Sequence, residues 1–300
     1  MRVGINPWPG YEFLYLAQEK GFFEAEGASI DLVEYGSLGD VARAFQRDQV
    51  DGMTSTLVEV LQVCARGDRC PKAVMVADYS DGADVLVARR GITSIAGLAG
   101  RRVAAEPASL SSYILARALD SHGLTFDDVD VKPLDVNAIP EALREGRVDA
   151  AVVYPPIALA LRDRPDMRVL FSSADIPGEV VDVVSIDPAV IDSRPADVRG
   201  LLRGWARALE YAESNPREAH AIMARRERIT PAAFRQSLNG LDVISLPRQG
   251  RLLDPGGRLS GTVERLRDML ARQGQVPPDL RTDVLEPAPL RAVLGPMEMP

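Results

Sequence analysis

Apolar residues along the first 190 positions alternate between short continuous runs and runs with helical spacing. Residues 2–7 form an apolar run typical of a buried strand, and residues 12–23 place Phe13, Leu16 and Phe23 along one helix face. The same pattern predicts strands at 2–7, 29–35, 50–57, 72–78, 84–89, 101–106, 129–134, 150–154, 168–172 and 180–186. Strands that alternate with helices predict an α/β fold with parallel sheets that helices cover on both faces.

Two serines mark helix starts between these strands, and the character of the chain changes after residue 186. Ser37 and Ser109 each stand before a helical pattern, where a serine commonly caps the first turn. The end of the chain is mostly helical, with helices expected at 195–215, 216–228, 231–241 and 259–273. The proline-rich tail beyond them is expected to be extended on the surface or frayed.

Length and charge limit the classes of function. The 300 residues fit about two domains, and the net charge of −8 with a pI near 5.0 argues against a nucleic-acid partner. No run approaches the roughly 18 apolar residues of a membrane span. Because no leader pattern precedes the first strand, we expect either a cytoplasmic protein or an exported chain without its leader.

The cysteines and histidines give no sign of a reactive or metal-binding centre. Cys64 and Cys70 have five residues between them, so they form either a disulfide in an oxidising compartment or two free thiols. Neither His122 nor His220 has a second ligand at metal-binding spacing, and no nucleophile, phosphate or dinucleotide motif occurs. We therefore expect no metal, no cofactor and no catalytic residue, which favours a binding protein over an enzyme.

Five segments resemble one known family. They are Asn-Pro-Trp-Pro-Gly-Tyr-Glu at 6–12, Leu-Ala-Gln-Glu-Lys-Gly-Phe-Phe at 16–23, Val-Asp-Gly-Met at 50–53, the stretch 95–104, and Gly-Arg-Val-Asp-Ala-Ala at 146–151. In this order they resemble the NMT1/THI5-like substrate-binding proteins of ABC importers, which bind nitrate, sulfonates, taurine or thiamine precursors. In the stretch 95–104, Gly97 stands where the family often has Asp.

The resemblance implies a type II periplasmic-binding-protein fold, with two lobes, a hinge and a ligand cleft between them. We place the first lobe at 1–84 and 186–300 and the second at 85–185, with the crossings near Val85 and Val183. The resemblance also implies an exported monomer that hands its ligand to the permease of an ABC transporter.

Candidate ligand-binding residues in the first lobe follow the predicted strands, because ligands of open α/β sheets bind beyond the carboxyl ends of strands. They are Asn6, Trp8 and Tyr11 after the first strand, and Ser55 and Thr56 after the third. Trp8, held between two prolines, could stack on a ligand or simply fill a gap between helices. Ser55 and Thr56 could hold an oxyanion, although plain helix capping also explains them.

Acidic residues mark both crossings. Asp81 and Asp84 could pair with an ammonium or ring N–H of the ligand, or they could form a solvated acidic turn. Asp182 lies near the second crossing, where the resemblance implies a ligand contact.

The second lobe supplies the strongest predicted anion site. Ser109, Ser111 and Ser112 open a helix, so hydroxyl groups and the helix dipole coincide there. Capping by Ser109 accounts for one of these serines but not for three. Tyr154 ends a strand before two prolines and is expected to face the cleft.

The leading hypothesis is a binding protein that closes on a small polar solute. An aromatic ring, hydroxyl groups and carboxylates together suit a zwitterionic or heterocyclic solute better than a bare anion, and the family resemblance adds a sulfonate to the expected ligands. One alternative is an enzyme on the same fold, of the lyase or dehydratase kind, which a buried acid–base pair with shifted pKa in the cleft would favour. Another alternative is the ligand-sensing domain of a signalling protein.

Overall fold

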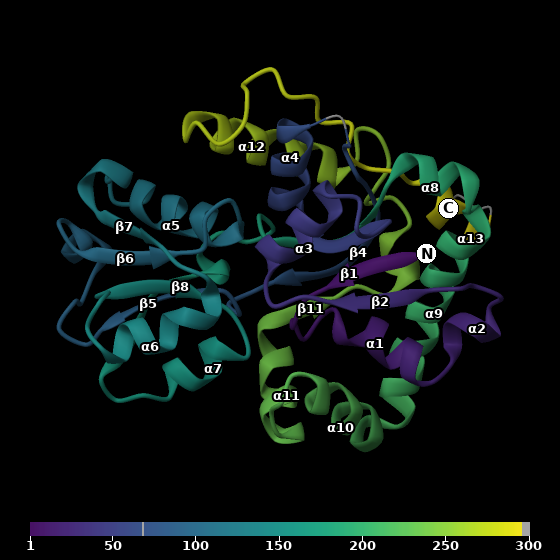
Figure 1. Cartoon of the computed structure of the whole chain (residues 1–300), viewed down its shortest axis with the longest axis horizontal. Helices are drawn as coiled ribbons and strands as arrows, with labels where there is room; N and C mark the ends of the chain where they lie inside the picture. Colours follow the sequence, from purple (N-terminus) through teal and green to yellow (C-terminus); the bar gives the residue numbers. More distant parts are fainter. Residues whose placement is uncertain (68, 296–300) are drawn as a thin grey trace.

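Two separate β-sheets form the centres of two α/β lobes that lie side by side (Figure 1). The computed structural model describes residues 1–67 and 69–295. The first sheet has the order β11-β4-β10-β3-β1-β2, and it contains β1 (Arg2–Ile5), β2 (Asp31–Glu34), β3 (Gly52–Thr56), β4 (Lys72–Ser80), β10 (Val181–Ile186) and β11 (Leu241–Val243). The second sheet has the order β7-β6-β8-β5-β9, and it contains β5 (Val85–Arg89), β6 (Arg102–Ala105), β7 (Asp130–Pro133), β8 (Ala150–Val153) and β9 (Met167–Ser172).

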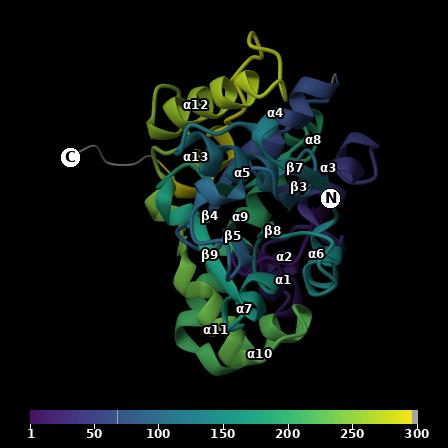
Figure 2. The same cartoon turned by 90° about the vertical axis from the view of Figure 1, so that its left-hand side faces the viewer.

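Helices cover both faces of each sheet, as the alternating pattern predicts. The second lobe has α5 (Leu110–Asp120), α6 (Ile139–Arg144) and α7 (Ile157–Arg162). The first lobe has α1 (Glu12–Glu19), α2 (Phe22–Ala25), α3 (Leu38–Gln46), α4 (Leu57–Arg66), α8 (Pro188–Ser193), α9 (Pro195–Ser214), α10 (Pro216–Arg226), α11 (Pro231–Ser237), α12 (Arg258–Arg272) and α13 (Ala288–Leu294). Figure 2 shows α12 at one end of the first lobe, and α10 with α11 at the other end.

The long helix α9 organises the first lobe because it packs against α1, α2, α10 and α13. A side-chain carbon at Gly204 would lie 2.4 Å from Phe23, and one at Gly200 would lie 2.3 Å from Ala28. The two glycines therefore allow α9 to approach the N-terminal segment closely. Trp205 of α9 is fully buried and packs edge-on against Phe13 of α1, with ring centroids 5.6 Å apart.

Both sheets are mixed, so the expectation of parallel sheets is wrong. β10 runs antiparallel to β3 and β4, and β5 runs antiparallel to β8 and β9. Both are strands that the chain enters directly from the other lobe. Such a strand starts at the edge of the sheet that faces the other lobe, where the neighbouring strands end, so it runs in the opposite direction.

The chain crosses between the lobes twice, between β4 and β5 and between β9 and β10. The expected division at 84/85 falls at the first crossing. Residues 181–185, which we assigned to the second lobe, belong to β10 in the first sheet, so the second change of lobe comes before Val181. Every residue of Val181–Ile186 is buried, as a central strand between β3 and β4 requires.

Some elements differ from the sequence prediction at the end of the chain. The expected extended or frayed tail instead places Ala73 of β4 between Val284 and Glu286, with hydrogen bonds of 2.7 and 2.9 Å, and then forms α13. Proline suits the first turn of that helix, where no intrahelical N–H bond is lost. The pattern also missed α8 and β11, which are short. The expected helical run at 12–23 ends near Gly21, whose positive φ of 67° separates α1 from α2.

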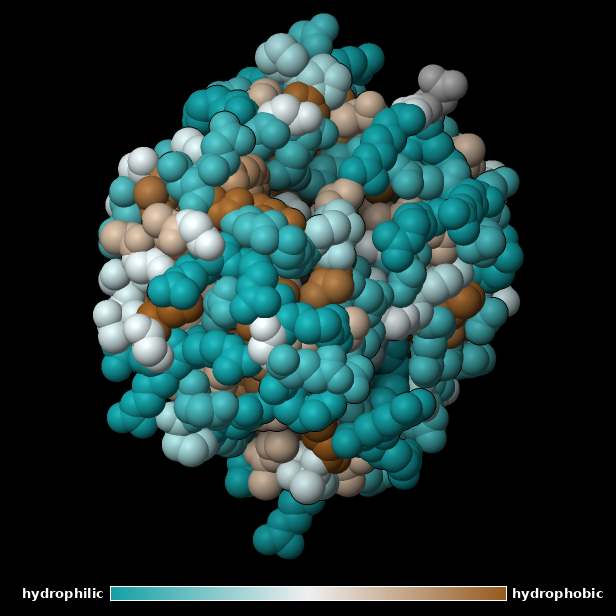
Figure 3. Space-filling model, turned by 60° about the vertical axis from the view of Figure 1, so that its left-hand side comes forward, coloured by the Kyte–Doolittle hydropathy of each residue, from teal (hydrophilic) through white to brown (hydrophobic). Residues whose placement is uncertain are grey.

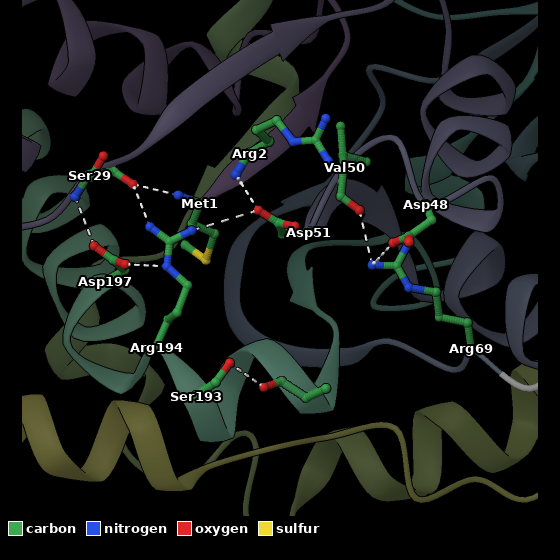
Figure 4. Close-up of polar contacts among 11 residues, drawn as sticks. Met1, Arg2, Ser29, Asp48, Val50, Asp51, Arg69, Ser193, Arg194 and Asp197 are labelled. Carbon is green, nitrogen blue, oxygen red and sulfur yellow. Dashed lines mark hydrogen bonds and ion pairs between the residues drawn. The ribbon is translucent and has the colours of Figure 1, made fainter.

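Charged groups fix the strand ends that lie away from the second lobe. Asp51 accepts a 2.7 Å hydrogen bond from the backbone N–H of Arg2 (Figure 4). Arg194 donates to Asp197 at 2.7 Å, and Asp197 accepts from the backbone N–H of Ser29 at 2.8 Å. These contacts join the start of β1 to the residue before β3, and the segment before β2 to the helical end of the chain.

Cys64 and Cys70 form a disulfide, so the first of the two alternatives is confirmed. The bond ties the C-terminal part of α4 to the segment that leads into β4. On the face turned forward in Figure 3 the surface is mostly hydrophilic, with apolar residues in small separate spots. Within residues 1–67 and 69–295, no helix combines the length and apolar character that a membrane crossing requires.

Candidate functional site between the two lobes

Strand ends of the first sheet bring several predicted site residues to the edge that faces the second lobe. The register pairs Asp182 of β10 with Thr56 of β3 on one side and with Asp78 of β4 on the other. Directly paired residues project from the same face of a sheet, so these three side chains are neighbours. All three are at most 2% exposed.

Trp8 lies over this group and is tied to it. Its ring N–H donates to Asp78 at 3.1 Å, and the Trp8 side chain is 4% exposed. The chain can turn so closely there because residue 10 is glycine: a side-chain carbon at Gly10 would lie 1.8 Å from a carboxylate oxygen of Asp78. The two prolines around Trp8 keep it out of a regular element, as expected, and the turn leads into α1.

Tyr11 completes the first-lobe side of the site. Its hydroxyl donates to Asp182 in a short hydrogen bond, and its ring lies 6.4 Å from that of Trp8. Burial is the main cause that raises the pKa of the Tyr11 hydroxyl, and the charge of Asp182 adds to it. Tyr11 therefore stays a neutral hydrogen-bond donor at all physiological pH values.

Glu59 joins the two lobes. Its carboxylate accepts from the backbone N–H of Thr56 at 2.9 Å and from the Thr56 hydroxyl, which forms a capping box at the start of α4. The other oxygen accepts at 2.5 Å from the backbone N–H of Leu110, at the start of α5 in the second lobe. One carboxylate thus occupies the positive ends of two helices.

The three serines at the start of α5 lie in that same region, but two of their hydroxyls are used on the protein's own backbone. Ser109 caps the helix by accepting from Ser111 N–H at 3.2 Å, as predicted. The hydroxyls of Ser109 and Ser112 both donate at 3.0 Å to the backbone carbonyl of Glu106. The structure therefore places the predicted anion-holding position against the protein's own Glu59.

Tyr154 and Asp84 face the junction, whereas Asp81 does not. The ring of Tyr154 packs edge-on against Trp8 of the other lobe, with centroids 6.1 Å apart, and Asp84 is 2% exposed. Asp81 is exposed and lines a separate surface cavity with Tyr79 and Arg248. The two acidic residues of the crossing thus have different environments, which the sequence did not distinguish.

Burial raises the pKa of the carboxyl groups at the junction. It is the largest cause at Asp78, whose pKa rises to about 8, and at Asp84 and Glu106, whose pKa values rise to about 7. For Asp182, burial and then the charges of Asp78 and Asp84 raise the pKa well above its ordinary value. Burial also raises the pKa of Glu59, against the hydrogen bonds from Thr56 and Leu110.

Several buried polar atoms at the junction have no hydrogen-bond partner within residues 1–67 and 69–295. They are Asn6 Oδ1, Thr54 Oγ1, Ser55 Oγ, Asp78 Oδ1, Asp84 Oδ2, both carboxylate oxygens of Glu106, the Tyr154 hydroxyl and Asp182 Oδ2. Buried polar groups are nearly always paired, so a concentration of such atoms at one place points to a ligand site. The atoms come from both lobes and from the first crossing.

The lobes also touch each other directly around this group. A side-chain carbon at Gly39 of α3 would lie 2.8 Å from Glu106 of the second lobe, and the Asn137 amide donates to the Gly36 carbonyl at 3.2 Å. Next to these contacts lies a cavity of about 400 Å³, lined by residues of both lobes that include Tyr35, Tyr154, Ile157 and Glu227. The lobes are thus in a closed arrangement.

Sequence reasoning missed three acidic residues that the fold brings to the junction: Glu59, Asp78 and Glu106. Asp78 lies in the acidic segment at the first crossing, where the sequence prediction names only Asp81 and Asp84. Glu59 had a visible signal, because Thr56 and Glu59 have the spacing of a capping box. Nothing in the local sequence marks Glu106 as facing another lobe.

A polar site between two α/β lobes that are joined by two crossing segments defines a two-lobed substrate-binding protein, the class of the solute-binding components of ABC importers. The family described as NMT1/THI5 like matches residues 8–219, and the chain belongs to that family.

The relatives include binding proteins. The taurine-binding periplasmic protein of Escherichia coli is 24% identical over 269 residues, which are 85% of this chain and 81% of that protein. The alkanesulfonate-binding protein SsuA from Xanthomonas axonopodis pv. citri, solved bound to MOPS, has a TM-score of 0.78 at 17% identity, over 96% of this chain and 98% of that one. Such low identity to a solved structure shows a shared fold and leaves the ligand open.

The relatives also include an enzyme. The 4-amino-5-hydroxymethyl-2-methylpyrimidine phosphate synthase of Aspergillus parasiticus is 22% identical over 230 residues, which are 70% of this chain and 65% of that protein. The named relatives of this chain thus comprise binding proteins and an enzyme.

Proposed function

We propose that this protein captures a small polar solute between its lobes and delivers it to the permease of an ABC transporter, without making or breaking a bond. The observation that carries the proposal is the group of buried, unpartnered polar atoms that both lobes contribute to one junction. A solute that pairs with these atoms would stabilise the closed arrangement only when it is present, as a transport signal requires.

Hinge closure in this proposal uses the crossings at residues 81–84 and 173–180. The hydroxyl groups of Ser80 and Ser173 lie 2.8 Å apart and join the two crossings, and Ser173 also accepts from the backbone N–H of Gly82 at 2.7 Å. The two segments would therefore bend together. We further propose that the protein acts as an exported, periplasmic component, in keeping with the names of its relatives and with the disulfide.

The proposed ligand residues are those that the geometry brings together. They are Asn6, Trp8, Tyr11, Ser55, Asp78, Asp84, Tyr154 and Asp182. Thr56, Ser109 and Ser112 would act indirectly, because their hydroxyls cap helices or hold the Glu106 backbone, and Ser111 donates its backbone N–H to the Ser109 cap.

Binding is tested on the purified, ligand-free chain by thermal shift against sulfonates, nitrate, amino acids, pyrimidines, flavins and polyamines. A ligand at 100 times its Kd should add about 2.7 kcal/mol to the free energy of unfolding, a shift in melting temperature of roughly 4–5 °C. Hits are titrated by the fluorescence of a Trp205→Phe variant, in which Trp8 is the remaining tryptophan of the two. A shift without a change of Trp8 emission would place the ligand elsewhere.

A second candidate function is an enzyme, and one observation favours it. Asp78, Asp84 and Glu106 have pKa values near neutrality, which suits proton transfer. Burial raises the pKa of a carboxyl group in a binding site as it does in an enzyme, so binding remains our first proposal. Each thermal-shift hit should be incubated with stoichiometric protein and followed by proton NMR. New ligand resonances that appear with the wild type but not with an Asp78 variant would favour the enzyme function over the transport function.

A further inference from the structure

The charged side chains that meet at the interlobe site are all acidic. Five carboxyl groups meet there, those of Glu59, Asp78, Asp84, Glu106 and Asp182, and each is at most 2% exposed. Within the part of the chain that the structure describes, none of the five forms a hydrogen bond or ion pair with a lysine or arginine side chain. Burial of unpaired carboxylates is costly, so the site needs positive charge or protons from elsewhere.

The positions that would normally hold an anion are already filled. The start of α5 and the start of α4 both donate to the Glu59 carboxylate, at 2.5 Å from Leu110 and 2.9 Å from Thr56. Glu106 lies over the first turn of α3, within 2.8 Å of where a side chain at Gly39 would begin. Protein carboxylates therefore occupy the starts of α4 and α5 and lie beside the first turn of α3, where a sulfonate or nitrate would otherwise find backbone N–H groups.

Four of the unpartnered atoms of the first lobe and the first crossing are amide or carboxyl oxygens, while the Thr54 and Ser55 hydroxyls can donate as well as accept. Asn6 uses its amide nitrogen on the Pro7 carbonyl at 3.1 Å and leaves Oδ1 free. Asp78 and Asp182 each leave one carboxylate oxygen after accepting from Trp8 and Tyr11, and Asp84 leaves Oδ2. A ligand that satisfies four acceptors must bring N–H or O–H donors.

Aromatic rings complete the environment. Trp8 has Tyr11 and Tyr154 as neighbours, with centroids 6.4 and 6.1 Å away, so rings from both lobes lie beside the carboxylates. Rings next to buried carboxylates favour a cation that carries some apolar surface.

We propose that the solute is an organic cation, an ammonium, an amidinium or a protonated nitrogen heterocycle, held by Asp78, Asp84 and Asp182 with its apolar part against Trp8 and Tyr154. This inference rests on the binding function proposed above and names the ligand class of the same site. It predicts that bare sulfonates and nitrate do not bind, unlike the ligands named for several relatives.

Isothermal titration of the ligand-free chain at pH 7.5 tests the sign of the ligand. The probes are agmatine, choline and 4-aminopyridine as cations, ethanesulfonate and nitrate as anions, taurine as a zwitterion, and Zn²⁺ and Ca²⁺ as metal ions. We expect heat from at least one organic cation and none from the anions. Binding of ethanesulfonate or nitrate but of no cation would overturn the inference and leave the binding function standing; binding of the metal ions alone would do the same.

Charge-neutral variants separate this site from an unspecific acidic surface. Asp84→Asn and Asp182→Asn should each weaken binding of the organic cation by roughly 10-fold or more, because a buried hydrogen bond between opposite charges is lost. Asp192→Asn, on an exposed residue of α8, should leave the affinity unchanged. Equal affinities in all three variants would overturn the assignment, with circular dichroism confirming that each variant is folded. If no probe of any class binds, both the inference and the proposed function fail.

Discussion

Glu59 of α4 accepts a 2.5 Å hydrogen bond from the backbone N–H of Leu110, the first residue of α5 in the opposite lobe. The same carboxylate closes the capping box of its own helix through Thr56. A single side chain thus links the starts of two helices across the interlobe junction. This relationship explains why a helix start that the sequence marks for an anion does not need one from outside.

Removal of the Glu59 carboxylate should destabilise the protein. Glu59→Ala leaves the N–H groups of Thr56 and Leu110 without their acceptor, and hydrogen bonds to charged groups are worth about 1.5–3 kcal/mol. Glu59→Gln keeps one acceptor oxygen and should lose less. Urea unfolding of the three proteins measures the difference. If the alanine variant were as stable as the wild type, the hydrogen bonds that Glu59 makes to the two helices would contribute nothing to stability.

The stability of the ligand-free protein should fall as the pH rises. The folded-state pKa of Asp78 is about 8, against 3.8 for the ordinary group, because of burial and the charges of Asp84 and Asp242. The folded form therefore holds a proton that the unfolded chain releases. The stability that this proton confers is complete below pH 4 and is lost as the pH rises through 8.

Melting temperatures between pH 5 and pH 9 measure how the stability depends on pH. Asp78→Asn should reduce the change in the free energy of unfolding by up to the equivalent of one proton, about 1.4 kcal/mol per pH unit. The neighbouring groups Tyr11, Asp84 and Asp182 remain in the variant as an internal reference. A bound organic cation favours the ionised carboxylates, so its affinity should rise with pH over the same range. An affinity that falls with pH would instead indicate an anionic ligand.

A methyl group at position 10 should disturb the site specifically. The added carbon of Gly10→Ala would fall 1.8 Å from Asp78 Oδ2, so the carboxylate or the Trp8 ring has to move. Overpacking of this kind costs about 1–3 kcal/mol, and ligand affinity should drop by roughly 10-fold. Gly67→Ala is the matched control, because no atom lies within 4 Å of its added carbon. Equal affinities of the two variants would contradict the position assigned to Asp78.

Reduction of the disulfide should affect stability but not binding. Cys64 and Cys70 close a short loop, for which the chain-entropy relation gives about 2 kcal/mol. The bond lies near the C-terminal end of α4, roughly 12 Å along the helix from Thr56 at its start. Thermal unfolding with and without dithiothreitol, beside a Cys64→Ala/Cys70→Ala variant, measures the first effect. Ligand titration of the same samples checks that the affinity is unchanged.

The local sequence predicted features that depend on neighbouring residues in the chain. The caps at Ser37 and Ser109, the alternation of strands and helices, and the rigid turn around Trp8 could be predicted because short-range hydrogen bonds and apolar spacing determine them. The family motifs at the chain start and at 146–151 added the two-lobed fold, which the periodicity could not distinguish from other α/β arrangements.

The tertiary structure decided which of the many polar residues share one site. Asp78 and Asp182 become neighbours because β10 returns from the second lobe to pair with β4, a contact between residues 104 positions apart. Asp81, three residues after Asp78, is exposed because it lies beyond the end of β4. The sequence determined the elements, since these follow from local spacing, while strand direction, the crossing before Val181 and the acidic character of the junction follow from long-range pairing that no local pattern records.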